Sequence, residues 1–518
     1  MSVFMKNGKE DLVSAISPID EKVIELQRKF DEAFDNQNVD ILISTIEDAK
    51  TILDTTSLNS ISIAALYYSI ATTYSDLQFF SEKFQNENTQ DTIVFYFRKS
   101  IDCLNEADKA DLDNSYRQGL KLNLFTNYAN TLNRNGRTIE ALQYYQKALD
   151  INPDFAMAEG NCGIAFTTYA NETFIPQHKE LLNYVAYTLL KSSLSKKNQL
   201  HHSASKQFER YLSIYDPDDM EELEKEINFT DCQLGDTEEE KKYREWLLYN
   251  RLYLNGMNDL PFLEKSMATD VLHLPSMLMN ISGGLEYKYH SMFNELKQEF
   301  ISARYNFYES SQLERPPHVA DKNTHLVNTL DYTQHSLRLE RLKLSYRSLY
   351  SLFDKVAYFL NEYFGLGIKE RDITFRSIWN SEKKGKRGYK YKNVLQYDKN
   401  HPLKAIYWLF KDLYVKTYKS PSPHAKKLNT IRNALEHKYV KVYSSDFSEG
   451  IDIKNESNLF AISEDILEGY TLQLLKMVRE LLIYLSLSVH IHEQQSYYAT
   501  EESYPSIHLQ QVEDDWKY

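Results

Sequence analysis

The segment 432–437, with the sequence RNALEH, carries three side chains that can act together on a phosphodiester bond. A histidine exchanges a proton with a ribose 2′-hydroxyl near neutral pH, so His437 is a candidate general acid or base. An arginine binds a phosphate and its developing charge through a planar fork of donors, which is the role expected of Arg432. Asn433 can orient either group through its carboxamide. This chemistry needs neither a metal ion nor a cofactor, and we expect none.

The spacing of these residues predicts that a helix presents them together. Apolar residues recur at spacings of three and four (Leu428, Ile431, Leu435) and would face the core. Asn433 and His437 are four residues apart and would lie on the opposite face, with the arginine on the flank. The alternative is an ordinary surface helix on which an arginine and a histidine lie near each other without a shared function.

The motif lies in a strongly basic part of an acidic protein of 518 residues with a net charge of −14. Between 383 and 443, 16 Lys and Arg stand against three acids, so this stretch carries +13 and the remainder −27. Lysines and tyrosines alternate in the run 383–392 and can neutralise phosphates and stack unpaired bases, although a solvated loop that binds nothing is the alternative. The candidate RNA-binding residues are Lys383, Lys384, Lys386, Arg387, Tyr389, Lys390, Tyr391, Lys392, Lys426, Lys427 and Lys438.

The first 195 residues show a helical repeat. Its clearest unit starts at Leu122 and has roughly the 34-residue period of a tetratricopeptide repeat. Ala129, Ala141 and Ala148 are small enough to let two helices approach closely, and Gly136 falls in the turn between them. Looser units before and after it extend the resemblance. We therefore predict a tetratricopeptide-like array over 1–195, whose concave face would hold a peptide or a partner protein.

The remainder of the chain is also predicted to be helical. With 15 Gly and 12 Pro, the sequence has too few turn residues for a many-stranded β fold, and we assign it to the all-α class. An acidic linker or exposed connection is expected over 196–244, a helical domain over 245–495 and a loosely attached tail over 496–518. The helices expected in that domain span 286–310, 333–364, 404–418, 425–439 and 464–494.

Other functional classes find little support in the sequence. It contains no phosphate-binding glycine loop, dinucleotide fingerprint, zinc-protease motif or serine-hydrolase motif. The three cysteines (Cys103, Cys162, Cys232) are far apart, as expected for a cytoplasmic protein. We find no signal peptide and no apolar stretch long enough to cross a membrane. His490 and His492 are two positions apart, so a helix would point them to different sides and we expect no metal there.

Arg432-Asn433-x3-His437 resembles the R-[polar]-x3-H motif of the HEPN (higher eukaryotes and prokaryotes nucleotide-binding) superfamily. The segments 246–255, 258–260 and 302–308 are similar to a HEPN subfamily often found behind tetratricopeptide-like repeats. The resemblance implies a bundle of about four helices that pairs as a homodimer, with two motifs forming one composite site. It also implies metal-independent RNA cleavage that leaves a 2′,3′-cyclic phosphate and a 5′-hydroxyl, with Arg432 and His437 catalytic and Asn433 their polar partner.

Together these features predict an RNA endonuclease with an N-terminal region that senses a signal or binds a partner. By analogy with the family, the setting would be antiviral defence by abortive infection or a toxin–antitoxin pair. A free ribonuclease is toxic to its host, so some restraint on the site is expected. The alternative is a non-catalytic repeat scaffold whose HEPN-like domain only dimerises or binds RNA.

Overall fold

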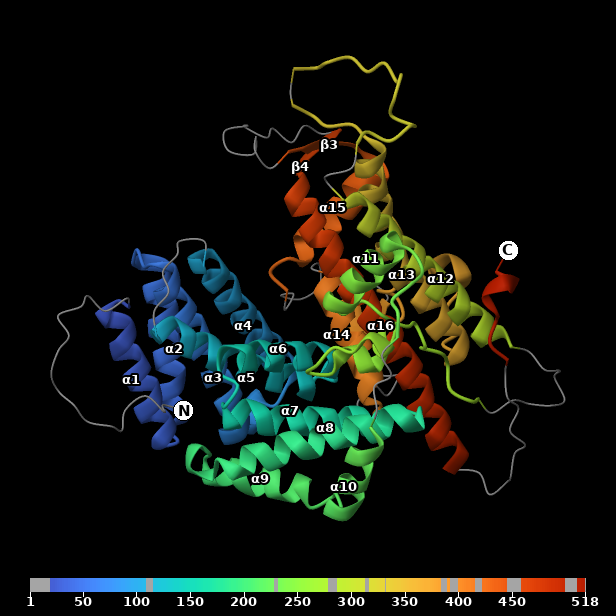
Figure 1. Ribbon diagram of the computed structural model, residues 1–518. Coiled ribbons are helices and arrows are strands. Elements are labelled where there is room, and N and C mark those ends of the chain that lie inside the picture. Colours follow the sequence, from blue (N-terminus) through green and yellow to red (C-terminus); the bar gives the residue numbers. More distant parts are fainter. Residues whose placement is uncertain are drawn as a thin grey trace. The chain divides into compact units, whose positions relative to one another are not determined.

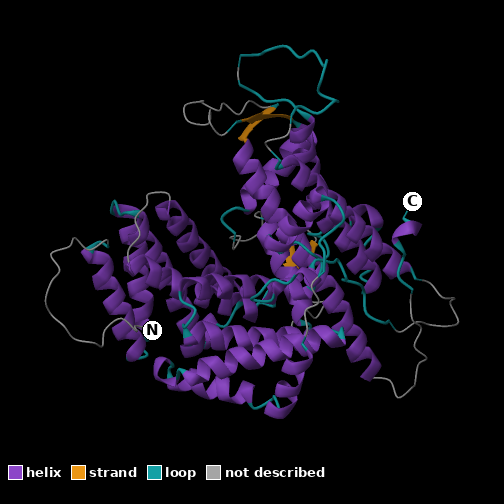
Figure 2. Ribbon diagram, in the orientation of Figure 1, coloured by secondary structure: helices purple, strands orange, loops and turns teal. Residues whose placement is uncertain are grey.

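The structure is a computed structural model that describes residues 19–108, 115–227, 232–277, 287–312, 316–330, 332–382, 389–391, 399–414, 422–444, 458–498 and 510–517. Helices dominate these ranges, and strand structure within them is confined to two pairs of short strands (Figure 2). The all-α assignment is therefore confirmed. Within the described part of the chain, no helix is both long and apolar enough to cross a membrane.

The chain divides into two compact units, and the path of the chain alternates between them. The first unit combines Met1–Phe166 and Val185–Glu221 with the distant segment Phe410–Asn429. The second unit combines Thr167–Tyr184 and Glu222–Leu409 with Thr430–Tyr518. Each unit is described below by itself.

Helices of the first unit are arranged as successive hairpins (Figure 1). Neighbouring helices pack in pairs, α1 with α2, α3 with α4 and α5 with α6, as the repeat pattern predicted. Ala129 and Ala141 are fully buried between α5 and α6, and Gly136 adopts the left-handed conformation (φ 85°) in the turn. The six helices are α1 (Glu21–Asp35), α2 (Val39–Thr55), α3 (Ser60–Phe80), α4 (Glu87–Asp108), α5 (Ser115–Arg134) and α6 (Thr138–Ile151).

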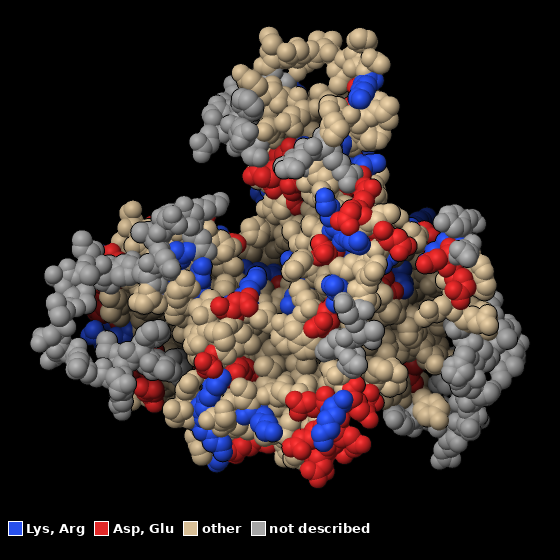
Figure 3. Space-filling view, in the orientation of Figure 1, with Lys and Arg blue, Asp and Glu red and all other residues tan. Residues whose placement is uncertain are grey.

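The segment 196–244, which was expected to be an acidic linker or exposed connection, contains helices. It contains the helices α9 (His202–Leu212) and α10 (Pro217–Glu226) and most of α11 (Glu238–Tyr249). Phe208 of α9 is completely buried, because Gly160 leaves room for its ring where a Cβ would lie 2.2 Å away. Helix α10 has no buried residue, and acidic side chains gather over it (Figure 3).

Two helices precede α9 and carry the chain from one unit into the other. They are α7 (Ala156–Glu172) and α8 (Pro176–Ser195). Short 3₁₀ turns complete the described helical structure. These turns are η1 (Glu82–Phe84), η2 (Lys197–Gln199), η3 (Gly256–Asp259), η4 (Lys265–Met267), η6 (Glu370–Asp372) and η10 (Asp514–Trp516).

In the second unit, α13 (Leu337–Tyr363) packs against both α12 (Lys288–Ser310) and α16 (Glu464–Tyr498). All three lie close to their predicted positions, although α16 continues four residues beyond the predicted end at 494. Two shorter helices, α14 (His401–Leu413) and α15 (Ala425–His437), complete the set. The predicted α14 extended to 418, but Tyr414 is already non-helical and 415–418 lie outside the described residues.

The predicted helix over 425–439 ends two residues early, because the chain turns at Lys438 into a strand. Strand β3 (Tyr439–Tyr443) pairs in parallel with β4 (Leu459–Ser463), which leads directly into α16. The Gln334 N–H donates to the Val442 carbonyl at 2.9 Å, so the chain before α13 borders the same strand. A second pair, β1 (Asn380–Glu382) with β2 (Tyr389–Tyr391), is antiparallel.

Buried ion pairs stabilise the interior of the second unit. The Arg479 guanidinium contacts both carboxylate oxygens of Asp259 at 2.8 and 3.0 Å and donates to the carbonyls of Tyr253 and Asn255. Arg304 pairs with Asp270 at 2.7 Å. The segments 246–260 and 302–308, on which the family resemblance partly rests, therefore contribute buried residues to the interior of this unit, although Tyr249 and Tyr305 are exposed.

Candidate active site

Helix α15 buries one face and exposes the other, as its sequence predicted. Leu428, Ile431 and Leu435 are at most 2% exposed and form the inward stripe. Asn433 and His437 are exposed on the other side of the helix. The i,i+4 relationship therefore leaves the amide and the imidazole accessible on one surface, where both can reach a large ligand.

Arg432 lies half-buried on the flank of this surface. Its Nη1 donates to the Asn433 side-chain oxygen at 3.1 Å. Its guanidinium carbon lies 5.8 Å from the centroid of the Tyr350 ring, which is within the range of a cation–π contact. The arginine is thus fixed by a hydrogen bond to its neighbour and by an aromatic face, and part of its fork stays accessible.

A stripe on α13 supports the motif from behind. Arg347, Tyr350 and Asp354 recur at spacings of three and four, so they lie on one face of that helix. Arg347 donates to the Leu435 carbonyl in the last turn of α15. This contact satisfies a carbonyl that a helix end otherwise leaves without a partner, and it places a cation at the negative end of the helix dipole.

Asp354 adds the third member of this stripe. Its side chain accepts a hydrogen bond from the Phe375 N–H at 2.8 Å. Burial raises the pKa of the carboxyl above its ordinary value, against the lowering effects of that N–H and of the Arg432 charge. The sequence analysis did not identify these three residues. Helix α13 carries many other polar residues, so only their shared spacing of three and four could have pointed to them.

His437 is the last residue of α15 and is exposed. The next residues enter β3, so the imidazole lies at the junction between helix and sheet. Within the described part of the chain, no side chain hydrogen bonds to it. One copy of the chain therefore holds Arg432 firmly and leaves the imidazole open to a ligand or to another protein surface.

The structure describes only some of the candidate RNA-binding residues. Lys426 and Lys427 are exposed in the first turn of α15, and Lys438 is exposed just after the helix. Tyr389, Lys390 and Tyr391 form β2, and the structure describes their backbone alone. Lys383, Lys384, Lys386, Arg387 and Lys392 lie outside the described residues.

The basic segment is not a uniformly basic surface. Lys411, which contributes to the local charge of +13, is only 4% exposed and forms ion pairs with Glu87 and Asp91. Counting charges along the sequence therefore overestimates the positive charge that a ligand can reach. Neutralised pairs inside the fold do not attract a polyanion.

His490 and His492 of α16, which lie outside the motif, contact other side chains of the second unit. His492 lies 2.9 Å from the Tyr363 hydroxyl, while His490 contacts the Phe174 ring at a centroid distance of 5.2 Å. The two imidazoles thus have different neighbours, as their i,i+2 spacing predicted. Among the described residues, no three His, Cys, Asp or Glu side chains are grouped so that they could hold a metal ion.

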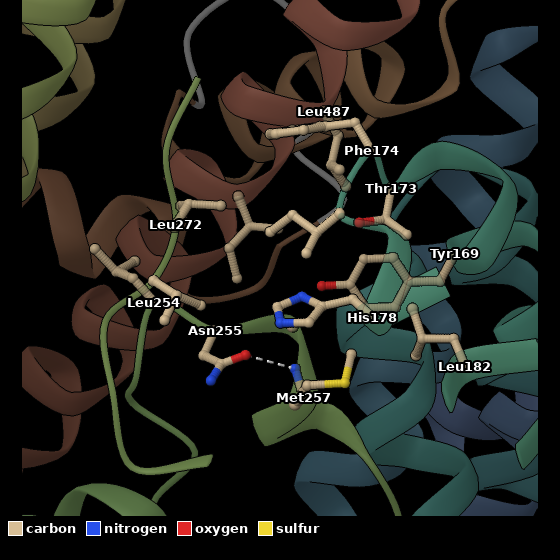
Figure 4. A pocket seen from close by; sticks show the side chains of 14 residues that line it. Tyr169, Thr173, Phe174, His178, Leu182, Leu254, Asn255, Met257, Leu272 and Leu487 are labelled. Atoms are coloured by element: carbon tan, nitrogen blue, oxygen red, sulfur yellow. Dashed lines mark hydrogen bonds between the residues drawn. The ribbon is translucent and has the colours of Figure 1, made fainter. Parts of the chain in front are cut away.

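A small cavity of about 20 Å³ lies in the second unit, lined by Tyr169, His178, Asn255 and mostly apolar side chains (Figure 4). This volume has room for one water molecule and not for a nucleotide. In Figure 4 the Asn255 side chain is occupied by its hydrogen bond from the Met257 N–H at 2.9 Å. The motif residues do not line this cavity. The candidate active site is the exposed face of α15, which carries Asn433 and His437 with Arg432 on its flank.

Comparison with known families adds to this geometry. Residues 284–492 match the LA2681-like HEPN family. The matched region includes α12 to α15, both strand pairs and most of α16, and it contains Arg432, Asn433 and His437. It supports the resemblance to the HEPN superfamily inferred from the sequence, although it begins at 284 and not at 245. No curated protein and no solved structure matches the chain.

Proposed function

We propose that this protein is a metal-independent RNA endonuclease whose HEPN-like domain cleaves RNA with Arg432, Asn433 and His437. The observation that carries the proposal is the placement of Asn433 and His437 on the exposed face of α15 with Arg432 on its flank, inside the region that matches the HEPN family. His437 exchanges the proton of the attacking 2′-hydroxyl, and Arg432 neutralises the phosphate. Asn433 orients the guanidinium through the hydrogen bond that joins them. The products carry a 2′,3′-cyclic phosphate and a 5′-hydroxyl.

We further propose that the active form is a homodimer. Each copy presents an exposed imidazole next to a guanidinium that is already fixed, so two motifs brought together supply two bases and two phosphate-binding groups. Lys426, Lys427 and Lys438 bind the flanking phosphates, since they are exposed along the same helix or just beyond it. The helical repeats of the first unit would receive a signal or a partner, in a setting of antiviral defence or a toxin–antitoxin pair.

The deciding experiment is cleavage of single-stranded RNA by the purified full-length protein in excess EDTA. Its variants are His437→Ala and, as a matched control, His202→Ala, which removes an exposed histidine of α9. We expect the wild-type protein and the control to release cyclic-phosphate ends, and His437→Ala to lose at least about a hundredfold in rate.

Equal residual activity in His437→Ala and the wild-type protein would place the cleavage elsewhere or in a contaminant, and the proposal would be wrong. Binding of RNA by all three proteins without any cleavage would favour the alternative, a scaffold whose HEPN-like domain only binds. Growth arrest of cells by the wild-type protein and not by His437→Ala would argue against the scaffold, because a binding protein keeps its surface in that variant.

A further inference from the structure

An exposed arginine of α13 reaches the end of α15 that carries the candidate catalytic histidine. The Arg347 guanidinium donates through Nη2 to the Leu435 carbonyl, and both residues belong to the second unit. Leu435 precedes His437 by two positions, a rise of about 3 Å along the helix. Because the carbonyls of a helix point toward its C-terminal end, the guanidinium lies at the same end of α15 as the imidazole.

The contact with Leu435 occupies one nitrogen of the Arg347 guanidinium. A guanidinium carries further N–H donors in a planar fork that matches the oxygens of a phosphate. Arg347 is exposed, so the donors that do not face the Leu435 carbonyl are open to a ligand. The side chain is therefore held at one point and accessible at the other, as Arg432 is.

Arg347 also keeps its charge, unlike the two other arginines of α13. Arg338 pairs with Glu464, and Arg341 pairs with Glu309 at 2.7 Å. Both of these carboxylates are at most 9% exposed and neutralise their arginines. Within the described part of the chain, Arg347 forms no ion pair, because its hydrogen bond goes to a neutral carbonyl. A charge that the fold leaves uncompensated attracts a polyanion, whereas a neutralised pair does not.

Two acids of the same region leave Arg347 accessible. Asp354 lies seven positions further along α13 and accepts a hydrogen bond from the Phe375 N–H. Glu436 is exposed in the last turn of α15, where solvent and salt screen its charge. Neither acid pairs with Arg347 among the residues that the structure describes.

The two guanidiniums join α13 and α15 at neighbouring turns. Arg432 of α15 lies over Tyr350 of α13, while Arg347 of α13 bonds to Leu435 of α15. Positions 347 and 350 are one turn apart, as are 435 and 432, so the two contacts are separated by a rise of about 4.5 Å. This separation is of the same order as the spacing of neighbouring phosphates along a nucleic-acid strand.

From this geometry we infer that Arg347 binds the RNA phosphate next to the scissile phosphate, which Arg432 binds. The inference rests on the proposed nuclease function and adds a substrate contact to it. The free donors of the Arg347 fork bind the phosphate oxygens while Nη2 stays on the Leu435 carbonyl. Arg347 is a substrate-binding residue and takes no part in the proton transfer, so it acts on RNA affinity and not on the chemical step.

Removal of the charge in the full-length protein tests this inference. Arg347→Gln loses the positive charge and keeps an N–H donor for the Leu435 carbonyl. Arg371→Gln, at an arginine whose side chain is 80% exposed, is the matched control. Binding is measured over a range of salt concentrations with single-stranded RNA whose 2′-hydroxyls are all methylated, because this RNA cannot be cleaved.

We expect Arg347→Gln to bind this RNA about fivefold to tenfold more weakly than the wild-type protein does. The slope of log K against log salt should become shallower by about 0.7, the value for one phosphate contact on a single strand. The control should keep the wild-type slope. In cleavage of unmodified RNA, KM should rise by a similar factor while kcat stays within about twofold of the wild-type value.

A neutral substitution in the RNA identifies the phosphate that Arg347 contacts. An oligonucleotide with one free 2′-hydroxyl, all others being methylated, has a single cleavage site. A methylphosphonate then replaces the neighbouring phosphate on the 5′ side or on the 3′ side. At one of these two positions it should weaken the wild-type protein as much as Arg347→Gln does, and it should have no further effect on that variant.

A merely structural role for Arg347 gives a different pattern. If Arg347→Gln keeps the wild-type salt slope, Arg347 does not contact a phosphate and the inference is wrong, whether or not kcat falls. Arg347→Lys is a milder variant for the case in which Arg347→Gln unfolds, which thermal unfolding reports. It keeps the charge and should retain the slope, with a loss of about twofold to threefold in affinity because the fork is missing.

Failure of the inference and failure of the proposed function give different results. Cleavage by the wild-type protein together with equal salt slopes in all variants would leave the nuclease intact and overturn the role of Arg347. Absence of cleavage together with a shallower slope in Arg347→Gln would overturn the nuclease and leave Arg347 as a phosphate contact of an RNA-binding protein. A wild-type protein that neither binds nor cleaves RNA would overturn both.

Discussion

The Arg432 guanidinium lies over the face of Tyr350, with its central carbon 5.8 Å from the ring centroid. Tyr350 is 4% exposed and comes from a helix that precedes α15 by more than 60 positions, so the ring forms a rigid support. An exposed arginine samples many rotamers, and binding a phosphate with it costs the entropy of fixing them. The aromatic support reduces that cost for a phosphate that Arg432 would bind.

This contact predicts different behaviour for two substitutions of the same residue. Tyr350→Phe keeps the ring under the guanidinium and should retain cleavage within about twofold of the wild-type rate. Tyr350→Leu removes the ring and should lower cleavage about fivefold, corresponding to a loss of about 1 kcal/mol of cation–π stabilisation. Single-turnover cleavage rates at saturating RNA give the comparison. If both variants cleave equally well, Tyr350 does not position Arg432.

The hydrogen bond between Arg432 and Asn433 leads to a second prediction. Arg432→Lys keeps the positive charge but loses the planar fork that contacts Asn433 and would bind the phosphate bidentately. We expect a loss of about a hundredfold in kcat with a smaller change in KM, because the developing charge on the phosphate is what the fork stabilises. Arg371→Lys, at an exposed arginine, is the matched control. A change in KM alone would limit Arg432 to RNA binding.

The arrangement within α15 could be predicted from the sequence because it depends on one helix. Helical periodicity separates Leu428, Ile431 and Leu435 from Asn433 and His437 without knowledge of any other element. The same reasoning correctly predicted an all-α chain and paired N-terminal helices. Periodicity also failed at a boundary, since the helix was extended to 439 while the chain enters β3 at Tyr439.

Contacts between elements that are far apart in the sequence could not be predicted from helical periodicity. Asp412 pairs with two arginines that lie 314 and 275 positions away in the sequence, and nothing local distinguishes it from a solvated acid. Lys411 was counted as part of a basic surface for the same reason. The support of Arg432 by Tyr350 likewise requires that α13 and α15 lie side by side, which their separate periodicities do not specify.

Acid should destabilise the second unit through His178. Burial lowers the pKa of this imidazole to about 4, and the neighbouring charge of His273 adds to the effect. Because the folded value lies below the ordinary value of about 6.5, the unfolded chain takes up the proton first as the pH falls. The stabilisation is complete above about pH 6.5 and is lost as the pH drops toward 4.

For this one group the free energy of unfolding should fall by about 2 kcal/mol between pH 7 and pH 5. Urea unfolding of the wild-type protein and of His178→Gln at both pH values measures it, with His202→Gln as the exposed control. The His178 variant should lose less stability on acidification than the other two proteins. Equal losses in all three would show that the partial burial of His178 beside the cavity does not lower its pKa.

The Arg479–Asp259 pair leads to a prediction about the interior of the second unit. Both side chains are at most 1% exposed, so Arg479→Met strands a buried carboxylate and should cost about 3–5 kcal/mol of stability. Adding Asp259→Leu removes the stranded charge and should recover part of the loss. Recovery stays incomplete because the Tyr253 and Asn255 carbonyls lose the donors that Arg479 supplies.

Thermal unfolding of the single and double variants tests this order of stabilities. Lys29→Met, which breaks an exposed pair with Glu25 at 3.8 Å, serves as the control and should change stability by less than about 0.5 kcal/mol. If the double variant is less stable than Arg479→Met, the leucine does not fit the space that Asp259 occupies, and its cost exceeds the relief of the stranded charge. If Arg479→Met unfolds at the same temperature as the wild-type protein, the pair is not buried, and the packing assigned to 246–260 is wrong.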